Sequence, residues 1–230
     1  MLQLSAIDYA SVAGFIAIWA GYTYFAEHSR VAQGNLINGM SARRREWILA
    51  MFTRENRMVD IQIVNALLRS GRFFASTAIL IIAGLLAVLG ATEKAIAFVM
   101  DLPFTVSTSR QVWEAKVLFM ILVFIYAFFK FVWSSRQYNY CSILIGAARP
   151  ASDLPDDLEA AVRPIATLAS LAAKHANRGI RAYYFGLAAL GWFVHPWVFL
   201  GAAVWVVLVL YRREFRSRTM RLIQGQDVTP

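Results

Sequence analysis

The chain has 230 residues, 59% of them hydrophobic and only 16% charged, and a formal net charge of +9. About a quarter of the residues in an ordinary soluble domain are charged, so this composition argues against that class and favours a membrane protein. The positive charge does not require a nucleic-acid partner, because cytoplasmic loops of membrane proteins retain Lys and Arg. The one cysteine, Cys141, excludes an internal disulfide and a cysteine-based metal cluster.

The first three apolar runs are each about 20 residues long, which at about 1.5 Å per residue matches a hydrocarbon core of roughly 30 Å. They predict membrane spans at about 7–26, 73–91 and 113–133. No Lys or Arg precedes the first run, which therefore lacks the basic start of a cleavable signal peptide. We expect this run to remain as a span.

The last apolar run covers 182–211 and is too long for one straight crossing without a steep tilt. Proline disrupts a helix interior and restricts the residue before it, so we expect a break at His195-Pro196. The run then forms a hairpin with arms at 182–194 and 197–211, and the alternative is a single kinked helix. The predicted fold is an all-α polytopic membrane bundle, one domain over 1–230, with four to five transmembrane helices.

Basic residues are unevenly distributed between these runs. Lys and Arg number eight in 27–72, two in 91–112, six in 134–181 and five in 212–230. Cytoplasmic loops carry the excess of Lys and Arg, so the pattern predicts an inner-membrane protein with its N-terminus outside. A final hairpin returns the basic C-terminal tail to the cytoplasm, which favours five crossings, or three crossings plus a deep hairpin, over four with a kinked last helix.

Two cytoplasmic segments, 41–72 and 134–180, are predicted to be helical extensions. In the first, Ile48, Met51 and Leu68 recur at helical spacing, and Ser41 is a plausible N-cap. The second contains a stretch that starts with acidic residues and ends with basic ones, an order that suits a helix. Pro164 is expected to divide that stretch in two.

The third span has no helix-breaking residue before position 148, so we expect one helix that projects past the membrane. Lipid is expected to end near Val132, within reach of a snorkelling Lys130. Lys130, Ser134, Gln137 and Cys141 then share one face of this helix. Such a row can line an exit vestibule or pack against neighbouring helices such as 41–70, and the packing interpretation is favoured because buried polar networks commonly serve structure.

Polar and basic residues at the inner ends of the second and third spans are the candidate pore- or ligand-lining residues. They are Arg72, Ser76, Lys130, Ser134, Arg136, Gln137 and Asn139. Positive-inside anchoring explains the basic ones without a ligand. His28 and His175 could pair across a metal or haem, but unpaired interfacial histidines are commoner, and we predict no metal or cofactor. No hydrolase elbow, zinc-protease motif or P-loop supports an enzyme.

Several stretches carry a resemblance to a known family. They are RRREWILAMFTRENRMVD, RSGRFFASTAIL, FFKFVWSSRQYNYCSILIGA and the YYF…VLYRREFRS ends of the last run. In these stretches the chain resembles the domain of unknown function 599 family, multi-pass membrane proteins of bacteria and plants. The resemblance implies an integral membrane protein and adds no catalytic residues.

Two functions remain open at this point. The first is an oligomeric channel or transporter for a small solute, since a small bundle forms a pore most easily between subunits, and its basic lining favours an anionic solute. The second is a scaffold or assembly partner that binds another protein or anionic lipids through its basic cytoplasmic helices. The expected partners are the lipid bilayer, anionic lipids and further copies of the chain.

Overall fold

In a computed structural model, which describes residues 5–29, 36–100 and 109–223, all regular secondary structure is helical. The helices in chain order are α1 (Ala6–His28), α2 (Leu36–Phe52), α3 (Met58–Gly90), α4 (Thr92–Met100), α5 (Arg110–Ala147), α6 (Leu158–Ala189), α7 (Gly191–Val194), α8 (Pro196–Phe215) and α9 (Arg218–Ile223). The prediction of an all-α fold is therefore confirmed for the described part of the chain.

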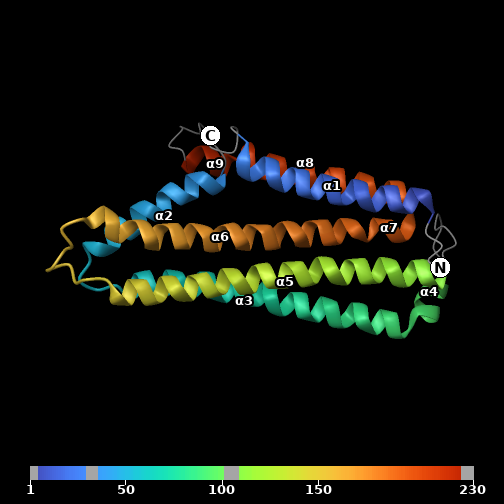
Figure 1. The fold of residues 1–230 in the computed structure, drawn as a ribbon, viewed down its shortest axis with the longest axis horizontal. Helices are drawn as coiled ribbons and strands as arrows, with labels where there is room; N and C mark the ends of the chain where they lie inside the picture. The colour runs from blue at the N-terminus through green and yellow to red at the C-terminus, as the bar shows by residue number, and fades with distance from the viewer. Residues whose placement is uncertain (1–4, 30–35, 101–108, 224–230) are drawn as a thin grey trace.

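The long helices α3, α5 and α6 lie side by side and run the length of the molecule (Figure 1). Helices α1 and α8 pack together beside one half, called here the α1–α8 half, while α2 lies beside the other half, called here the α2 half. Each half has its own apolar core. Phe15, Phe185 and Phe199 are buried in the first, and Ile48, Met51 and Val162 in the second.

Two of the described helices, α3 and α5, are long and apolar enough to cross a membrane. Only 11% of the most apolar window of α3 is buried inside the molecule, so this helix is not a covered core helix of the kind found in soluble proteins. It leaves large apolar side chains, such as Leu80 and Leu86, exposed on the surface of the molecule.

Helix α5 extends over 38 residues without interruption, which confirms the expectation of one helix from the third apolar run into the polar stretch after it. At about 1.5 Å per residue it is about 57 Å long, well beyond a hydrocarbon core of roughly 30 Å. The Ser109 side chain caps its first turn by accepting a hydrogen bond from the backbone N–H of Val112.

The last apolar run breaks at His195-Pro196, as predicted. His195 has an extended backbone, and its Nδ1 accepts a hydrogen bond from the backbone N–H of Trp197 at 3.2 Å, while Pro196 begins α8. A Cβ at Gly191 would lie 3.1 Å from the carbonyl oxygen of Val198, so the tight approach of α7 to α8 depends on glycine. Helices α6 and α8 therefore run in opposite directions (Figure 1).

Four details of the sequence prediction are wrong. The arm 182–194 is not a separate helix, because α6 is continuous from Leu158 to Ala189. Pro164 does not divide it, since Pro164 and Ala160 are both exposed and water can satisfy the carbonyl that proline leaves free.

The segment 41–72 is also not one helix, because a turn at 53–57 separates α2 from α3. Arg57, the last residue of that turn, anchors it by donating to the carbonyl oxygens of Ala148 at 2.7 Å and of Arg149, at the end of α5. Ser41 lies inside α2 and hydrogen-bonds Ser170 at 2.8 Å instead of capping the helix.

Helices α5 and α6 pack closely because two aromatic rings on α5 lie against two glycines on α6. A Cβ at Gly179 would lie 2.7 Å from ring atoms of Phe131, and a Cβ at Gly186 would lie 2.8 Å from the ring of Phe124. Both pairs are spaced by seven residues in antiparallel helices, so the contact repeats every two turns.

We predict that Gly179→Ala and Gly186→Ala each destabilise the protein by about 1–3 kcal/mol, because a methyl group overpacks the contact with a buried ring. Gly146→Ala on α5 is the control, since no atom lies within 4 Å of a Cβ placed there. Thermal unfolding of the purified protein in detergent measures the effect. Equal melting temperatures for all three variants would contradict the packing described.

Candidate functional site

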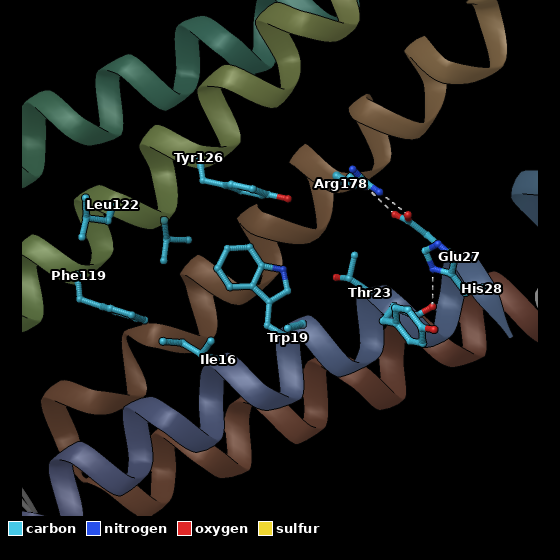
Figure 2. Close-up of a pocket in the computed structure, with 12 residues that line it drawn as sticks. Ile16, Trp19, Thr23, Glu27, His28, Phe119, Leu122, Tyr126 and Arg178 are labelled. Atoms are coloured by element: carbon cyan, nitrogen blue, oxygen red, sulfur yellow. Dashed lines mark hydrogen bonds and ion pairs between the residues drawn. The ribbon is translucent and has the colours of Figure 1, made fainter. Parts of the chain in front are cut away.

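A buried ionic cluster lies where the ends of α1 and α8 meet α6. Glu27, near the end of α1, has a side chain only 5% exposed and forms ion pairs with three cations of α6. Arg178 binds both carboxylate oxygens, with its Nε 2.7 Å from Oε1, and the Lys174 ammonium lies 3.0 Å from Oε2. The guanidinium of Arg181 is 3.7 Å from Oε1. Figure 2 shows the Glu27–Arg178 pair.

Arg181 extends the cluster to α8. Its side chain is 2% exposed and makes a two-point contact with Glu214, with Nε 2.9 Å from Oε1 and Nη2 2.7 Å from Oε2. The Tyr22 hydroxyl donates to the same carboxylate at 3.0 Å, and the guanidinium lies over the Tyr22 ring. Two-point Arg–carboxylate contacts are strong and directional, so they fix α1 and α8 against α6.

The cluster and its surroundings carry an excess of positive charge. Among the described residues, Lys130, Lys174, Arg178 and Arg181 face the two carboxylates, Glu27 and Glu214. Burial alone would raise the pKa of Glu27, but the hydrogen bonds from Arg178 and Lys174 outweigh it and lower the pKa to about 2, so this carboxylate is ionised at neutral pH.

The surroundings of His175 and Lys130 show the same excess of positive charge. Burial, and then the charges of Lys130, Arg178 and Lys174, lower the pKa of His175. The Lys130 ammonium lies 4.9 Å from the centre of the Tyr126 ring, a cation–π contact that carries no negative charge. The positive potential here is therefore only partly neutralised by the chain itself.

A groove of about 520 Å³ between α1 and α5 ends at this cluster (Figure 2). Its apolar part is lined by Ile16, Trp19 and Ala20 of α1 and by Phe119, Leu122 and Val123 of α5. Its polar end is formed by Thr23, Tyr24, Glu27, His28, Tyr126 and Arg178. A mostly apolar cavity of this size with a few convergent polar groups is typical of small-molecule sites.

A second polar contact joins α1, α5 and α7 at the end of the bundle that lies away from the ionic cluster. Lys116, 5% exposed, donates to the carbonyl oxygen of Trp192 at 2.9 Å, and the indole N–H of Trp192 donates to Asp8 at 2.9 Å. Between this contact and the ionic cluster, the rings of Phe15, Phe199 and Trp192 stack, with centroid distances of 4.5 Å and 5.2 Å. This part of the bundle interior is therefore filled by side chains.

The candidate residues from the sequence do not gather at one place. Ser134 is buried and donates to the carbonyl oxygen of Ala172 at 2.7 Å, and Gln137 is buried. The remaining candidates apart from Lys130 are exposed: Arg72 and Ser76 on α3, and Arg136 and Asn139 on α5. Lys130 alone among the seven lies beside the groove, and a pore-lining role for the set stays a prediction.

The polar row on α5 packs against α6. Ser134 bonds Ala172, and the Cys141 thiol lies 3.9 Å from the carbonyl oxygen of Ile165. This supports the packing interpretation of the row, with α6 as a neighbour in addition to the 41–70 segment, whose Ile48 and Val64 share a core cluster with Cys141.

Two of the histidines, His28 and His175, have contacts with aromatic rings. His28 stacks on Tyr24 with centroids 4.6 Å apart, and His175 lies edge-on to Trp133. Over the parts of the chain that the structure describes, no group of three or more His, Cys, Asp or Glu side chains is arranged to hold a metal ion.

Sequence reasoning missed the two carboxylates that organise the site. Glu27 and Glu214 each follow an apolar run and stand near basic residues that the positive-inside rule already explains. The signal available in the sequence is an acidic residue at the inner end of a predicted span, where an unpaired carboxylate is costly and so requires a basic partner.

We predict that Arg181→Ala destabilises the protein by about 3–5 kcal/mol, because it leaves Glu214 buried without its main partner. Adding Glu214→Gln to Arg181→Ala should recover part of the loss. Arg45→Ala, which breaks the exposed Arg45–Glu159 pair, is the control and should have no measurable effect. Denaturation in mixed micelles measures all of these variants, and a loss for Arg181→Ala no larger than for the control would refute the role of the cluster.

Comparison with known proteins identifies the family of this chain. A family model described as "Protein of unknown function, DUF599" matches residues 10–219. No curated protein and no solved structure matches the chain. Because the family model covers most of the sequence, the chain belongs to the DUF599 family, as its resemblance predicts.

Proposed function

We propose that the chain is an integral protein of the inner membrane that crosses the bilayer five times, with α1, α3, α5, α6 and α8. The length and apolar surface of α3 and α5 support this, as does the alignment of all five helices along one direction in the α1–α8 half (Figure 1). Large apolar side chains exposed on three different helices, Leu80, Leu122 and Trp205, suit contact with lipid.

The basic residues support an orientation. Arg72, Lys130, Arg178 and Arg213 mark the inner ends of four of these helices, where Lys and Arg anchor a helix at the cytoplasmic surface. The N-terminus then lies outside, and the α2 half projects into the cytoplasm.

Site-specific thiol labelling tests this topology. Native Cys141 is unsuitable as a probe, because burial raises the pKa of its thiol to about 12 and the side chain is only 1% exposed. In a Cys141→Ala background, we expect an impermeant maleimide to label Ala97→Cys in intact cells and Ser152→Cys only after the cells are opened. The reverse pattern would overturn the orientation.

The function that the site supports best is binding and transport of a membrane-dissolved amphiphile through the groove between α1 and α5. The observation that supports this function is a groove whose apolar wall ends at a charged cluster. An amphiphile needs an apolar surface for its tail and a polar surface for its headgroup. The groove is open at the side of the bundle, so its ligand can enter directly from lipid.

A channel through the middle of one copy has less support. The stacked rings of Phe15, Phe199 and Trp192 occupy that part of the bundle interior. An oligomeric channel for small anions, as proposed from the sequence, would therefore need a path between copies of the chain. The groove requires no second copy.

Widening of the groove involves few contacts between its two walls. Trp19 lies edge-on to Tyr126 with centroids 5.4 Å apart, and Phe15 lies edge-on to Phe119 at 5.6 Å. Helix α1 packs chiefly on α8, and both are held to α6 at the charged end, so their apolar ends can tilt together away from α5 while the α1–α8 contact is kept. Such rigid-body movement of one helical unit against another is a common form of transport motion.

A lipid-exchange assay tests the function. Full-length protein in vesicles should speed the movement of a fluorescently labelled phospholipid between leaflets. Ala20→Phe fills the groove and should return the rate to that of protein-free vesicles. Ala17→Phe, one turn away on α1 and not part of the groove lining, should exchange lipid like the wild type. A wild-type rate equal to that of empty vesicles would refute transport by this protein.

A scaffold function is the second candidate, supported by the α2 half. This half has its own buried core and exposes apolar residues of α3, including Met58 and Val59, outside the proposed membrane region. If Ala20→Phe leaves the protein's cellular role intact while polar substitution of Val59 abolishes it, the scaffold function replaces transport.

A further inference from the structure

We propose that the ligand of the groove is an anionic phospholipid of the inner leaflet, with an acyl chain along the apolar wall and its phosphate at Lys130 and Arg178. This inference rests on the proposed function, because it assigns a chemical class to the ligand of the same groove. It also gives a role to Lys130, which among the seven candidate pore- or ligand-lining residues is the one that lies beside the groove.

The dimensions of the groove fit one leaflet. Its lining on α1 runs from Ile16 to His28, which at about 1.5 Å per residue is about 18 Å. Half of a hydrocarbon core of roughly 30 Å is about 15 Å, so the groove spans about the depth of one acyl layer. Its charged end then lies at the level of the inner headgroups. A water-soluble anion would have no use for the apolar length.

The charges select an anionic headgroup. Lys130 has a cation–π contact with Tyr126, which lines the groove, and no described carboxylate forms an ion pair with it. Arg178 is 26% exposed at the polar end and contacts Glu27 with part of its guanidinium. A phosphate between these two cations would balance charge that Glu27 leaves over, and planar guanidinium groups suit phosphate oxygens.

The charges argue against a cationic headgroup. A cation placed here would meet the positive charges of Lys130, Lys174 and Arg178, which also add to the effect of burial in lowering the pKa of His175.

Quenching of Trp19 fluorescence tests the inference, because Trp19 lies in the groove wall (Figure 2). Full-length protein in detergent micelles is titrated with brominated phosphatidylglycerol or brominated phosphatidylcholine. Subtracting the signal of a Trp19→Phe variant isolates the contribution of this residue. We expect half-quenching at an about fivefold lower mole fraction of the anionic lipid, the ratio expected from one cation near an anionic lipid.

Two variants make the test specific. Lys130→Gln removes a cation without breaking any described ion pair and should abolish the preference for the anionic lipid. Arg72→Gln removes an exposed cation of α3, which does not line the groove, and should keep the preference. Added inorganic phosphate should not displace the anionic lipid, since it lacks the acyl chain.

The outcomes separate the two proposals. Equal quenching by both lipids, an unchanged preference in Lys130→Gln, or a preference lost equally in Arg72→Gln overturns the anionic headgroup and leaves groove binding intact. Displacement by inorganic phosphate overturns the lipid as the source of the anion. Absence of any Trp19-dependent quenching overturns both the inference and the use of the groove by lipids.

Discussion

The buried contact between Arg181 and Glu214 is the constraint on which the arrangement of helices depends. Charges removed from water must be paired, and the pairing here is two-point and supported by Tyr22. It joins α6 to α8, while Glu27 joins the same stretch of α6 to α1. The apolar rings farther along make contacts that are less directional, so the charged contacts supply the register.

Polar contacts have a similar role in the α2 half. Asp60 is fully buried and accepts from the Trp47 indole at 2.7 Å and from Arg54, so the turn between α2 and α3 folds around its carboxylate. Arg57 in the same turn satisfies carbonyl oxygens at the end of α5, where the helix dipole favours a cation. The long helices α3, α5 and α6 link the two halves into one body.

Features that depend on local physics were predictable from the sequence. The continuity of α5 follows from the absence of any breaking residue, and the break before α8 follows from Pro196. The turn at 53–57 was not predictable, because Arg57 acts on carbonyls about 90 positions away in the chain. The candidate site was missed for the same reason. Arg178 and Glu27 are 151 positions apart, so no spacing rule connects them, and of the residues proposed only Lys130 lies beside the groove.

The helices that form the groove differ in how firmly they are held, and this difference bears on how the groove can work. Helices α5 and α6 are held by the repeated Phe–Gly contacts, with rings against Gly179 and Gly186 that leave no room for adjustment. The α1 wall meets α5 through the ring edges of Phe15 on Phe119 and of Trp19 on Tyr126, and the charged contacts secure it to α6 at the polar end. Moving α1 therefore requires the least free energy where the groove is apolar and the most where it is charged. An acyl chain can thus be admitted or released from the side while the polar end keeps its shape, which is the order of events that lateral uptake of an amphiphile requires.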